Sequence, residues 1–362
     1  NMKSAVLYEY GKDLSVEQVS IGEPAVGEVL VRMKASGVCH SDYHVIKGDF
    51  PHIPLPNILG HEGSGIGERI GSGVDNLEEG DHVILTWKPG CGRCEMCQQG
   101  WISVCDDFMP MIKVDPISDI SGKKLNKMVG LGTFSEFSIV PQSSIVKIGK
   151  EIPFPQAALI GCGVTTGVCA VINSANVIPG TSVAVFGCGG VGLNVIQGAR
   201  IASATTIIAV DILDNKLEMA RTFGATHTVN ASQLDPVEEI KKITGGEGAH
   251  YAFEAIGLIP EPFEQSVMCT RKRGITVWLG AAPFETKVSL DARALFTERT
   301  IKGSYYGSSR PHIDFHRMID LYKNKLLKID ELISMECSID DINYAFKLLK
   351  EGQVARSVIV YD

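Results

Sequence analysis

Four cysteines within one short stretch are the residues of this sequence with the clearest chemistry. They are Cys91, Cys94, Cys97 and Cys105. Four thiolates of one loop converge readily on a zinc ion at about 2.3 Å, and a site with all four positions filled is structural rather than catalytic. The alternative is a pair of disulfides, which needs an oxidising compartment. We favour structural zinc.

The compartment decides between these two interpretations. The first residues, NMKSAVLYEYGKD, lack the apolar core and the cleavage site of a secretory signal. We therefore expect a cytoplasmic protein whose thiols stay reduced, where clustered cysteines more often hold metal.

A second set of ligand-type residues indicates an open metal site. His61 and Glu62 are adjacent, and Cys39 and Cys162 lie in the glycine-flanked segments SGVCHSD and IGCGVTTG, which we expect to be turns. A lone histidine is more often a core or loop residue. Two sulfurs and one nitrogen together, however, leave one tetrahedral position free, which is the arrangement of a catalytic zinc.

A glycine-rich turn indicates a dinucleotide site. The strand-like run SVAVF leads into Gly187, Gly189, Gly190, Val191 and Gly192, and a helical pattern follows. Asp211 ends the next strand-like run and would accept hydrogen bonds from ribose hydroxyls. A carboxylate there repels a 2′-phosphate, and the residues after it are Ile and Leu rather than Arg, so NAD is favoured over NADP. The alternative is an ordinary glycine-rich turn.

The elements that must position these residues divide the chain into three parts. Residues 1–163 hold short alternating strands and the cysteine-rich lobe 91–105, and residues 164–305 alternate buried strands with helices. That alternation predicts a doubly wound parallel α/β sheet. Residues 306–362 contain two amphipathic helices and a last strand, VARSVIVYD. We expect this part to return to the first domain, because the α/β series is complete without it.

Size and charge restrict the class of protein. The chain has 362 residues, 44% of them hydrophobic, a net charge of −8 and a pI near 5.7. No basic face for nucleic acid is evident, and no run approaches the roughly 20 apolar residues that span a bilayer. We expect a protein of small-molecule substrates, with neither nucleic acid nor membrane as partner.

Together these motifs resemble the zinc-dependent medium-chain alcohol dehydrogenases over nearly the whole length. The Gly-His-Glu signature, the four-cysteine lobe, the Gly-Cys-Gly segment and the glycine turn with its Asp occur in the family order and spacing. The resemblance implies a GroES-like β-rich catalytic domain with two zinc ions, joined to a Rossmann domain that binds NAD.

The resemblance also implies roles for individual residues. Cys39, His61 and Cys162 correspond to the catalytic zinc ligands, and Glu62 to an acid that approaches the metal. Asp42 corresponds to the carboxylate that orients the histidine, and Ser41 and His44 to the proton relay. The remaining correspondences are His40 and Arg356 near the pyrophosphate, Lys216 near the adenosine ribose, Thr166, Val191 and Leu279 near the nicotinamide, and Trp87 and Phe50 in the substrate pocket.

The activity implied is reversible oxidation of primary or secondary alcohols to aldehydes or ketones by hydride transfer to NAD. The apolar pocket residues favour hydrophobic or aromatic alcohols. Polyol dehydrogenases, thiol-adduct (formaldehyde-type) dehydrogenases and a non-catalytic zinc- and nucleotide-binding relative remain alternatives. A homodimer or homotetramer is expected. The segment 106–132 matches no family pattern, and a cover for the pocket mouth is one role open to it.

Overall fold

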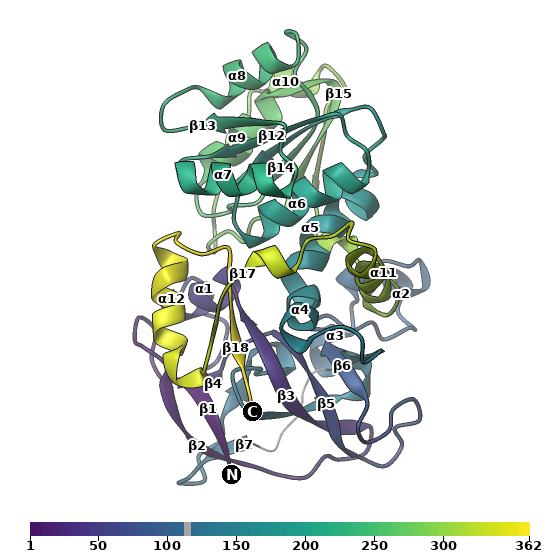
Figure 1. The fold of residues 1–362 in the computed structure, drawn as a ribbon, viewed down its shortest axis with the longest axis vertical. Helices are drawn as coiled ribbons and strands as arrows, with labels where there is room; N and C mark the ends of the chain where they lie inside the picture. The colour runs from purple at the N-terminus through teal and green to yellow at the C-terminus, as the bar shows by residue number, and fades with distance from the viewer. Residues whose placement is uncertain (112–116) are drawn as a thin grey trace. The chain divides into compact units, whose positions relative to one another are not determined.

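The computed structural model describes residues 1–111 and 117–362, so five residues of the segment 106–132 lie outside the described part (Figure 1). The chain forms two compact units. Unit 1 comprises Asn1–Cys162, Arg310–Lys323 and Ile329–Asp362, and unit 2 comprises Gly163–Ser309 and Asn324–Lys328. Most of the C-terminal part belongs to unit 1, while residues 306–309 and 324–328 belong to unit 2.

A five-stranded sheet forms one layer of unit 1. Its order is β7-β2-β1-β4-β8. The strands are β1 (Met2–Leu7), β2 (Ser15–Ile21), β4 (Asn57–Ile58), β7 (Ile117–Asp119) and β8 (Asn126–Lys127). Buried apolar side chains of β1, β2 and β4 form a small core of their own under this sheet.

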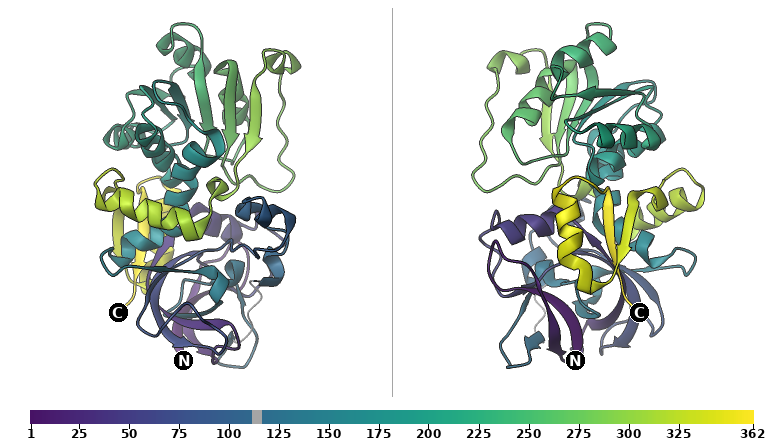
Figure 2. Two further views of the ribbon diagram at one scale, coloured as in Figure 1. Left: turned by 90° about the vertical axis from the view of Figure 1, so that its right-hand side faces the viewer. Right: turned by 60° about the vertical axis from the view of Figure 1, so that its left-hand side comes forward.

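The second sheet of unit 1 carries the metal-ligand candidates. It has seven strands in the order β10-β6-β5-β3-β18-β17, with β9 also paired to β3. The strands are β3 (Glu28–Val38), β5 (Glu62–Ile70), β6 (His82–Leu85), β9 (Phe137–Pro141), β10 (Ile145–Ile148), β17 (Ile333–Cys337) and β18 (Arg356–Val360). The C-terminal strand β18 lies antiparallel to β3, with Ser357 opposite Val38. Segments from the two ends of the sequence therefore share one sheet (Figure 2).

Short helices complete unit 1. They are α1 (His40–Lys47), α2 (Glu95–Gln98), α3 (Phe108–Met111), α4 (Phe154–Leu159), α11 (Pro311–Lys323) and α12 (Ile342–Lys350). The apolar face of α12, with Ile342, Phe346 and Leu349, is buried in the main core of the unit. This is the amphipathic pattern that the sequence predicts for the segment.

Unit 2 is a doubly wound parallel sheet. Its order is β13-β12-β11-β14-β15-β16, and every neighbouring pair is parallel. The strands are β11 (Ser182–Phe186), β12 (Thr206–Asp211), β13 (His227–Asn230), β14 (Ala249–Glu254), β15 (Thr270–Trp278) and β16 (Thr300–Gly303). The helices are α5 (Thr165–Cys169), α6 (Gly190–Ile201), α7 (Asp214–Phe223), α8 (Pro236–Ile243), α9 (Pro260–Met268) and α10 (Ala292–Leu295). All five residues of β11 are buried, as in a sheet covered on both faces.

One helical stretch corrects the sequence analysis. Residues 154–175 form a continuous helical run of 22 residues that is long and apolar enough to cross a membrane, so the expectation that no such run exists was wrong. Of its most apolar window, 89% is buried inside the protein, which is typical of a core helix. Within it, Ile160–Val164 is π-helical, so Cys162 lies in a helix and not in the turn that its flanking glycines suggested.

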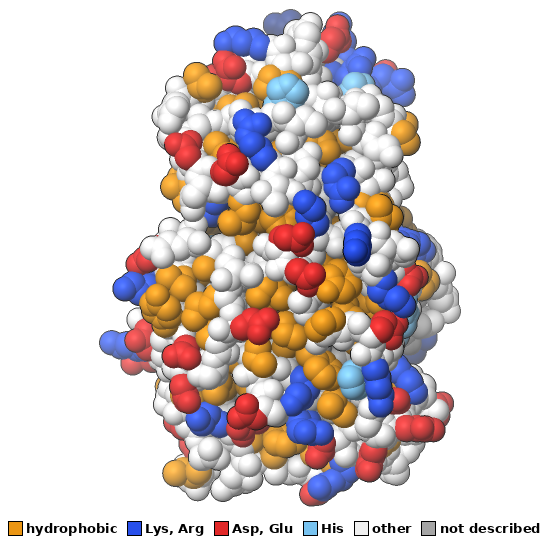
Figure 3. Space-filling view, in the orientation of Figure 1, with side chains coloured by type: hydrophobic (Ala, Val, Ile, Leu, Met, Phe, Trp, Pro, Cys, Tyr) orange, Lys and Arg blue, Asp and Glu red, His pale blue; other side chains and the backbone are white. Residues whose placement is uncertain are grey.

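Charges of both signs share the surface. On the face drawn in Figure 3, acidic side chains lie among the basic ones. The sequence as a whole carries a net charge of −8.

Candidate metal and nucleotide sites

The four cysteines of the lobe meet at one point. Their sulfur atoms all lie within 4.8 Å of one another. The distances Cys91 Sγ to Cys97 Sγ and Cys94 Sγ to Cys105 Sγ are both 3.9 Å. A tetrahedron with Zn–S bonds of about 2.3 Å has edges of about 3.8 Å, whereas a disulfide bond is about 2.05 Å long. The residues present therefore fit a zinc ion, and all ten cysteines are free thiols.

Backbone amides surround these sulfurs. Cys91 Sγ accepts from the N–H groups of Arg93 (3.5 Å) and Cys94 (3.2 Å), and Cys94 Sγ accepts from that of Cys97 (3.4 Å). The amides of Cys97 and Asp106 lower the pKa of the Cys94 thiol to about 7. Such N–H donors stabilise thiolates, and the thiolate is the form that binds metal.

The second cluster joins Cys39, His61, Glu62 and Cys162. One ligand atom from each lies within 4.8 Å of the others, and all four residues are buried. Strand pairing produces this arrangement, because β3 and β5 lie antiparallel with Gly37 opposite Glu62. Cys39 follows the end of β3 as the N-cap of α1, and His61 immediately precedes β5.

Asp42 links the members of this cluster. Its Oδ1 accepts from Gly60 N (2.9 Å) and from His61 Nδ1 (3.2 Å), and its Oδ2 accepts from Cys39 N (3.3 Å). The bond to Nδ1 leaves Nε2 of His61 for a metal. Burial lowers the pKa of His61, but the Asp42 carboxylate and then Cys39 together outweigh burial and hold that pKa well above the usual value.

A buried ion pair lies against the cluster. The guanidinium of Arg356, at the start of β18, pairs with the carboxylate of Glu62, and both side chains are at most 4% exposed. Burial raises the pKa of Glu62 to about 7, against the opposing effect of Arg356. A Cβ at Gly37 would collide with Glu62 Oε2, so the pair needs glycine there. Arg356 was expected near the pyrophosphate, and the structure places it beside Glu62.

The two relay residues lie on α1 beside Cys39. Ser41 Oγ is 3.9 Å from Cys39 Sγ. The Nδ1 atom of the buried His44 is 2.8 Å from Asp49 Oδ2, and Asp49 also pairs with Lys47 at 3.1 Å. Partial burial opposes ionisation of Asp49, but His44 and Lys47 hold its pKa below the usual value. The sequence analysis missed Asp49, although an acid just past the glycine that ends α1 is a local signal.

The two pocket candidates lie against histidines of the site. The Trp87 ring meets the His61 ring edge-on, with centroids 6.3 Å apart and planes at 89°. The Phe50 ring lies over His44 with a centroid distance of 5.2 Å. Both aromatic side chains are partly buried and pack on the main core of unit 1.

The glycine turn of unit 2 has the shape of a phosphate cradle. It joins β11 to α6, whose N-cap is Gly189. A Cβ at Gly192 would overlap the carbonyl oxygen of Gly187, so only glycine lets the helix approach the turn. A Cβ at Gly189 would meet no atom within 4 Å, which leaves the space over the helix N-terminus open for a phosphate.

Asp211 ends β12 beside this turn. Its Oδ2 accepts from Cys188 N (2.8 Å), and its Oδ1 accepts from Ile212 N (2.8 Å) and Leu213 N (3.1 Å). These bonds fix the carboxylate at the carboxyl edge of the parallel sheet, where dinucleotides bind in this type of fold.

The other predicted cofactor residues are divided between the units. Val191 lies in the first turn of α6, Lys216 in that of α7, Thr166 in α5, and Leu279 just after β15. These four belong to unit 2, whereas His40, the first residue of α1, and Arg356 belong to unit 1. The buried Glu254, absent from the sequence analysis, orders two loops: its Oε1 accepts from Ile256 and Gly257, and its backbone oxygen accepts from Leu279 and Gly280.

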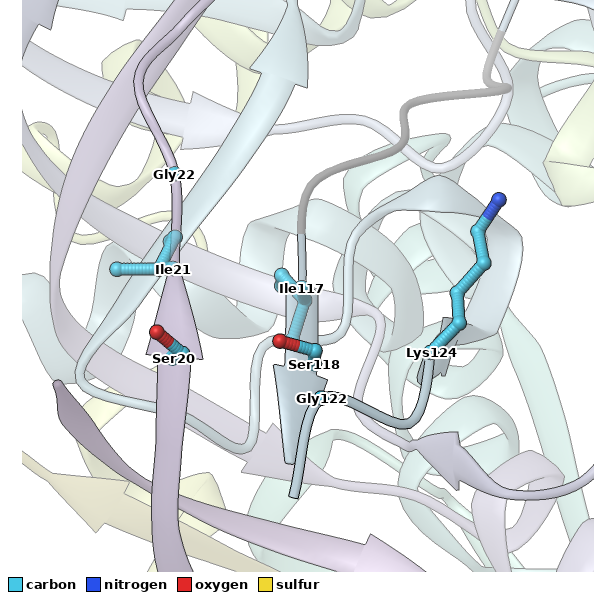
Figure 4. Close-up of a pocket in the computed structure, with 7 residues that line it drawn as sticks. All are labelled: Ser20, Ile21, Gly22, Ile117, Ser118, Gly122 and Lys124. Carbon is cyan, nitrogen blue, oxygen red and sulfur yellow. The ribbon is translucent and has the colours of Figure 1, made fainter. Parts of the chain in front are cut away.

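A shallow hollow on unit 1 is separate from these residues. Ser20 and Ile21 at the end of β2 line it together with Ser118 of β7 and Lys124 (Figure 4). The described residues that line it include neither a cysteine nor a histidine. We therefore do not assign the chemistry to it.

Two family models match the chain. An alcohol dehydrogenase GroES-like domain matches residues 25–150, and a zinc-binding dehydrogenase domain matches residues 190–324. The first covers the four cysteines of the lobe, and the second covers most of the α/β sheet.

Known proteins match over the full length. The chain is 37% identical to S-(hydroxymethyl)glutathione dehydrogenase of Paracoccus denitrificans, covering 99% of each chain. It is 35% identical to alcohol dehydrogenase B of Mycobacterium tuberculosis, covering 99% of this chain and 98% of that one. The crystal structure of benzyl alcohol dehydrogenase from Acinetobacter calcoaceticus superimposes with a TM-score of 0.93 at 33% identity, covering 100% and 99%. The chain therefore belongs to the zinc-type alcohol dehydrogenases of the medium-chain dehydrogenase superfamily and is a nicotinamide-dependent alcohol oxidoreductase.

Proposed function

We propose that this enzyme reversibly oxidises primary or secondary alcohols with aromatic or other hydrophobic groups, using NAD and zinc. The observation that carries the substrate class is the Trp87 ring standing edge-on to His61, because it sets an apolar wall beside the metal cluster. The solved benzyl alcohol dehydrogenase, similar over the whole chain, supports this choice.

Cys39, His61 and Cys162 would hold the catalytic zinc, which supplies Lewis acidity to a substrate oxygen in the remaining position. Asp42 holds the His61 ring in the tautomer that presents Nε2. Arg356 balances the buried charge of Glu62, so that this carboxylate can remain next to the ligands.

A proton leaves the substrate hydroxyl in this reaction, and α1 carries the groups to receive it. Ser41 lies beside the ligand Cys39, and His44 lies one helical turn further on. Asp49 accepts a hydrogen bond from Nδ1–H of His44, which leaves Nε2 of that ring as the proton acceptor.

NAD is proposed on the chemistry of Asp211. Its carboxylate is fixed by three backbone N–H groups and repels a 2′-phosphate. Arg356 Nε is buried and has no hydrogen-bond partner among the described residues. The contact of Arg356 with the pyrophosphate stays a prediction from the family resemblance.

A panel of substrates tests the proposal. We expect kcat/KM to be higher for benzyl alcohol than for ethanol or for a polyol such as sorbitol, and higher with NAD than with NADP. Zinc analysis of the purified protein should give two ions per chain, one in each cluster. Higher kcat/KM for the polyol, or for NADP, would contradict the corresponding part of the proposal.

The second candidate is a formaldehyde-type activity on a thiol adduct. The 37% identity to the S-(hydroxymethyl)glutathione dehydrogenase favours it. The same panel, extended with S-(hydroxymethyl)glutathione, separates the two. A kcat/KM for this adduct that exceeds that for benzyl alcohol would select the second candidate.

We also propose that the enzyme is a homo-oligomer. Strand β16 is an edge of the six-stranded sheet, and Phe296 and Tyr305 next to it are 93% and 50% exposed. An edge strand is a template for pairing with a second copy. Light scattering coupled to size exclusion should report a dimer or tetramer, and a monomer at micromolar concentration would contradict the proposal.

A further inference from the structure

A buried threonine lies against the segment that carries His61 and Glu62. Thr133, in the connection between β8 and β9, is fully buried. A Cβ built on Gly60 would lie 2.5 Å from Thr133 Oγ1, and a Cβ built on Gly63 would lie 2.6 Å from Thr133 Cγ2. Carbon atoms in contact lie about 3.5–4.0 Å apart, so both positions need glycine because the threonine is there. One side chain thus contacts the backbone on both sides of the ligand-type pair.

Backbone hydrogen bonds join Thr133 to the same segment. The Thr133 N–H donates to the carbonyl oxygen of Gly60 at 3.0 Å. The N–H of Gly60 donates to Asp42 Oδ1 at 2.9 Å. Both peptide groups of Gly60 are therefore fixed, and the second of them leads directly into His61.

Thr133 is itself held by two elements distant in sequence. Its Oγ1 lies 2.6 Å from Ser36 Oγ of β3. Its carbonyl oxygen accepts from the hydroxyl of Tyr361, just after β18, at 2.7 Å. Ser36 lies three residues before Cys39, so Thr133 ties the strand that leads to one ligand to the loop that carries another.

We propose that Thr133 is a positioning residue of the catalytic zinc site, whose side chain fills the space between the two glycines and fixes the backbone of His61 and Glu62. The inference rests on the proposed function, because that function assigns zinc to this cluster. Thr133 has no role as a ligand. Asp42 orients the ring of His61, whereas Thr133 orients the main chain that carries this ring.

The expected consequence concerns one of the two metals only. Groups outside the ligand set hold the ligands in place, and their loss typically costs about 10- to 100-fold in metal affinity. The four-cysteine lobe includes none of the contacts of Thr133 described above. A side chain that only stabilises the fold would, when it is replaced, leave no such difference between the two sites.

The contact between Thr133 Cγ2 and Gly63 allows a sharp test. Thr133→Ser removes this methyl group and keeps the hydroxyl group for Ser36. Gly63→Ala adds a methyl group that overlaps Cγ2 and also meets Met33 Cε, the flexible end of a side chain, at 2.6 Å. In the double variant Thr133→Ser/Gly63→Ala, the overlap with Cγ2 is gone.

Zinc release into excess chelator is followed with a colorimetric dye, and Cys39→Ser, which lacks a catalytic ligand, identifies the phase that belongs to the lobe. We expect the catalytic zinc to leave about tenfold faster from Gly63→Ala and about threefold faster from Thr133→Ser. The double variant should release it more slowly than Gly63→Ala, since residues in contact do not contribute additively. The lobe zinc should leave at the wild-type rate in all three variants.

A matched control lies in unit 2. Thr276 of β15 is 1% exposed, and its hydroxyl donates to the carbonyl oxygen of Ser266 at 3.2 Å. Thr276→Ala should lower Tm without changing either rate of zinc release. If Gly63→Ala does not fold, Thr133→Ala replaces it in the comparison. This variant loses both the methyl and the hydroxyl group, so it should release the catalytic zinc faster than Thr133→Ser.

The outcomes separate this inference from the proposed function. Two zinc ions per chain, with wild-type release of the catalytic zinc from the Thr133 and Gly63 variants, would overturn the role of Thr133 alone. A double variant in which the two effects simply multiply would also overturn it, as would faster release from both sites, which indicates a general loss of stability. Wild-type protein with zinc in the lobe only would contradict the proposed function itself.

Discussion

At the scale of single residues, Asp42 organises the metal cluster. Its two oxygens accept hydrogen bonds from the backbone of Cys39 and Gly60 and from the ring of His61. One buried carboxylate thereby fixes both ligand-bearing loops and the tautomer of the histidine. Its position three residues after Cys39 makes it readable from the sequence once Cys39 is taken as a ligand.

Replacing this carboxylate tests its role. In Asp42→Asn, one oxygen becomes an amide that cannot accept, so the Nδ1 bond or the backbone bonds are lost. We expect catalytic zinc affinity and kcat/KM to fall about 10- to 100-fold. Metal analysis after dialysis and steady-state kinetics measure this. The exposed Asp75→Asn is the control, and unchanged zinc retention in Asp42→Asn would contradict the role.

Residue types and spacing predicted both cysteine-containing clusters, because metal ligands follow strict chemistry. The structure brings Cys39, His61 and Cys162 together as their ligand types required. Gly37 could not be found this way, because its significance depends on the Glu62 carboxylate, which is distant in sequence.

At the scale of elements, the turn between β11 and α6 offers two glycines with different constraints. The fold itself requires glycine at position 192. At position 189, glycine is required only if a phosphate occupies the open space beside it. We expect Gly192→Ala to lower both Tm and NAD affinity. Gly189→Ala should leave Tm within about 1 °C, since the new methyl group meets no atom, and weaken NAD binding more than tenfold by filling the phosphate space.

Calorimetric titration with NAD and thermal melts distinguish the two variants. The result that would contradict the nucleotide assignment is normal NAD affinity in Gly189→Ala. A large loss of Tm in the same variant would instead show that the space at Gly189 is smaller than the structure indicates.

A histidine at the start of the parallel sheet leads us to predict that the free energy of unfolding depends on pH. His250 of β14 accepts at Nδ1 from Ser182 N of β11 (3.2 Å), and Arg271 lies 2.8 Å from its Nε2. Burial, and then Arg271, lower the pKa of His250. In the folded protein the pKa of His250 lies below the unfolded value of about 6.5. The contribution of neutral His250 to stability is therefore present above the unfolded pKa and is lost as the pH falls through the folded pKa.

His250→Asn should remove this dependence, since its amide oxygen still accepts from Ser182. The difference in unfolding free energy between wild type and variant, from urea denaturation, should favour wild type more at pH 8 than at pH 5. A difference that stays constant over this range would contradict the assignment.

The segment that carries Cys162 was predicted wrongly from the sequence, as a turn instead of a helix. Its glycines suggested a turn. In the structure, a Cβ at Gly167 would lie 2.5 Å from Asn194 Cβ, so this glycine permits close packing of α5 on α6. Local propensity favoured a break, and tertiary packing overrode it. The alternating strands and helices of unit 2 were predictable, because each buried strand is an apolar run bounded by turn residues.

At the scale of the whole molecule, one ion pair connects distant parts of the chain. Glu62 and Arg356 are 294 positions apart and both are buried. Arg356→Met leaves the carboxylate without its cation, and we expect a loss of about 3–5 kcal/mol in unfolding free energy. The double variant Glu62→Gln/Arg356→Met should recover much of it, because no charge is then left unpaired.

Urea denaturation of the two single variants and the double variant gives this cycle. Lys3 and Asp340 form a matched pair, similarly distant in sequence but exposed, and Lys3→Met should have a far smaller effect. Additive losses in the Glu62 and Arg356 variants would show that the two side chains act independently.

The distance in sequence between Glu62 and Arg356 also affects the order in which the surroundings of the metal cluster are completed during synthesis. Cys39, His61 and Cys162 emerge early, but strand β18, which pairs with β3 and supplies Arg356, emerges nearly two hundred residues after the last of these ligands. Until then, Glu62 lacks its counterion and the ligand-bearing strand lacks a neighbour. A nascent polypeptide therefore has all four ligand-type residues of this cluster before it has the strand and the cation that complete their surroundings.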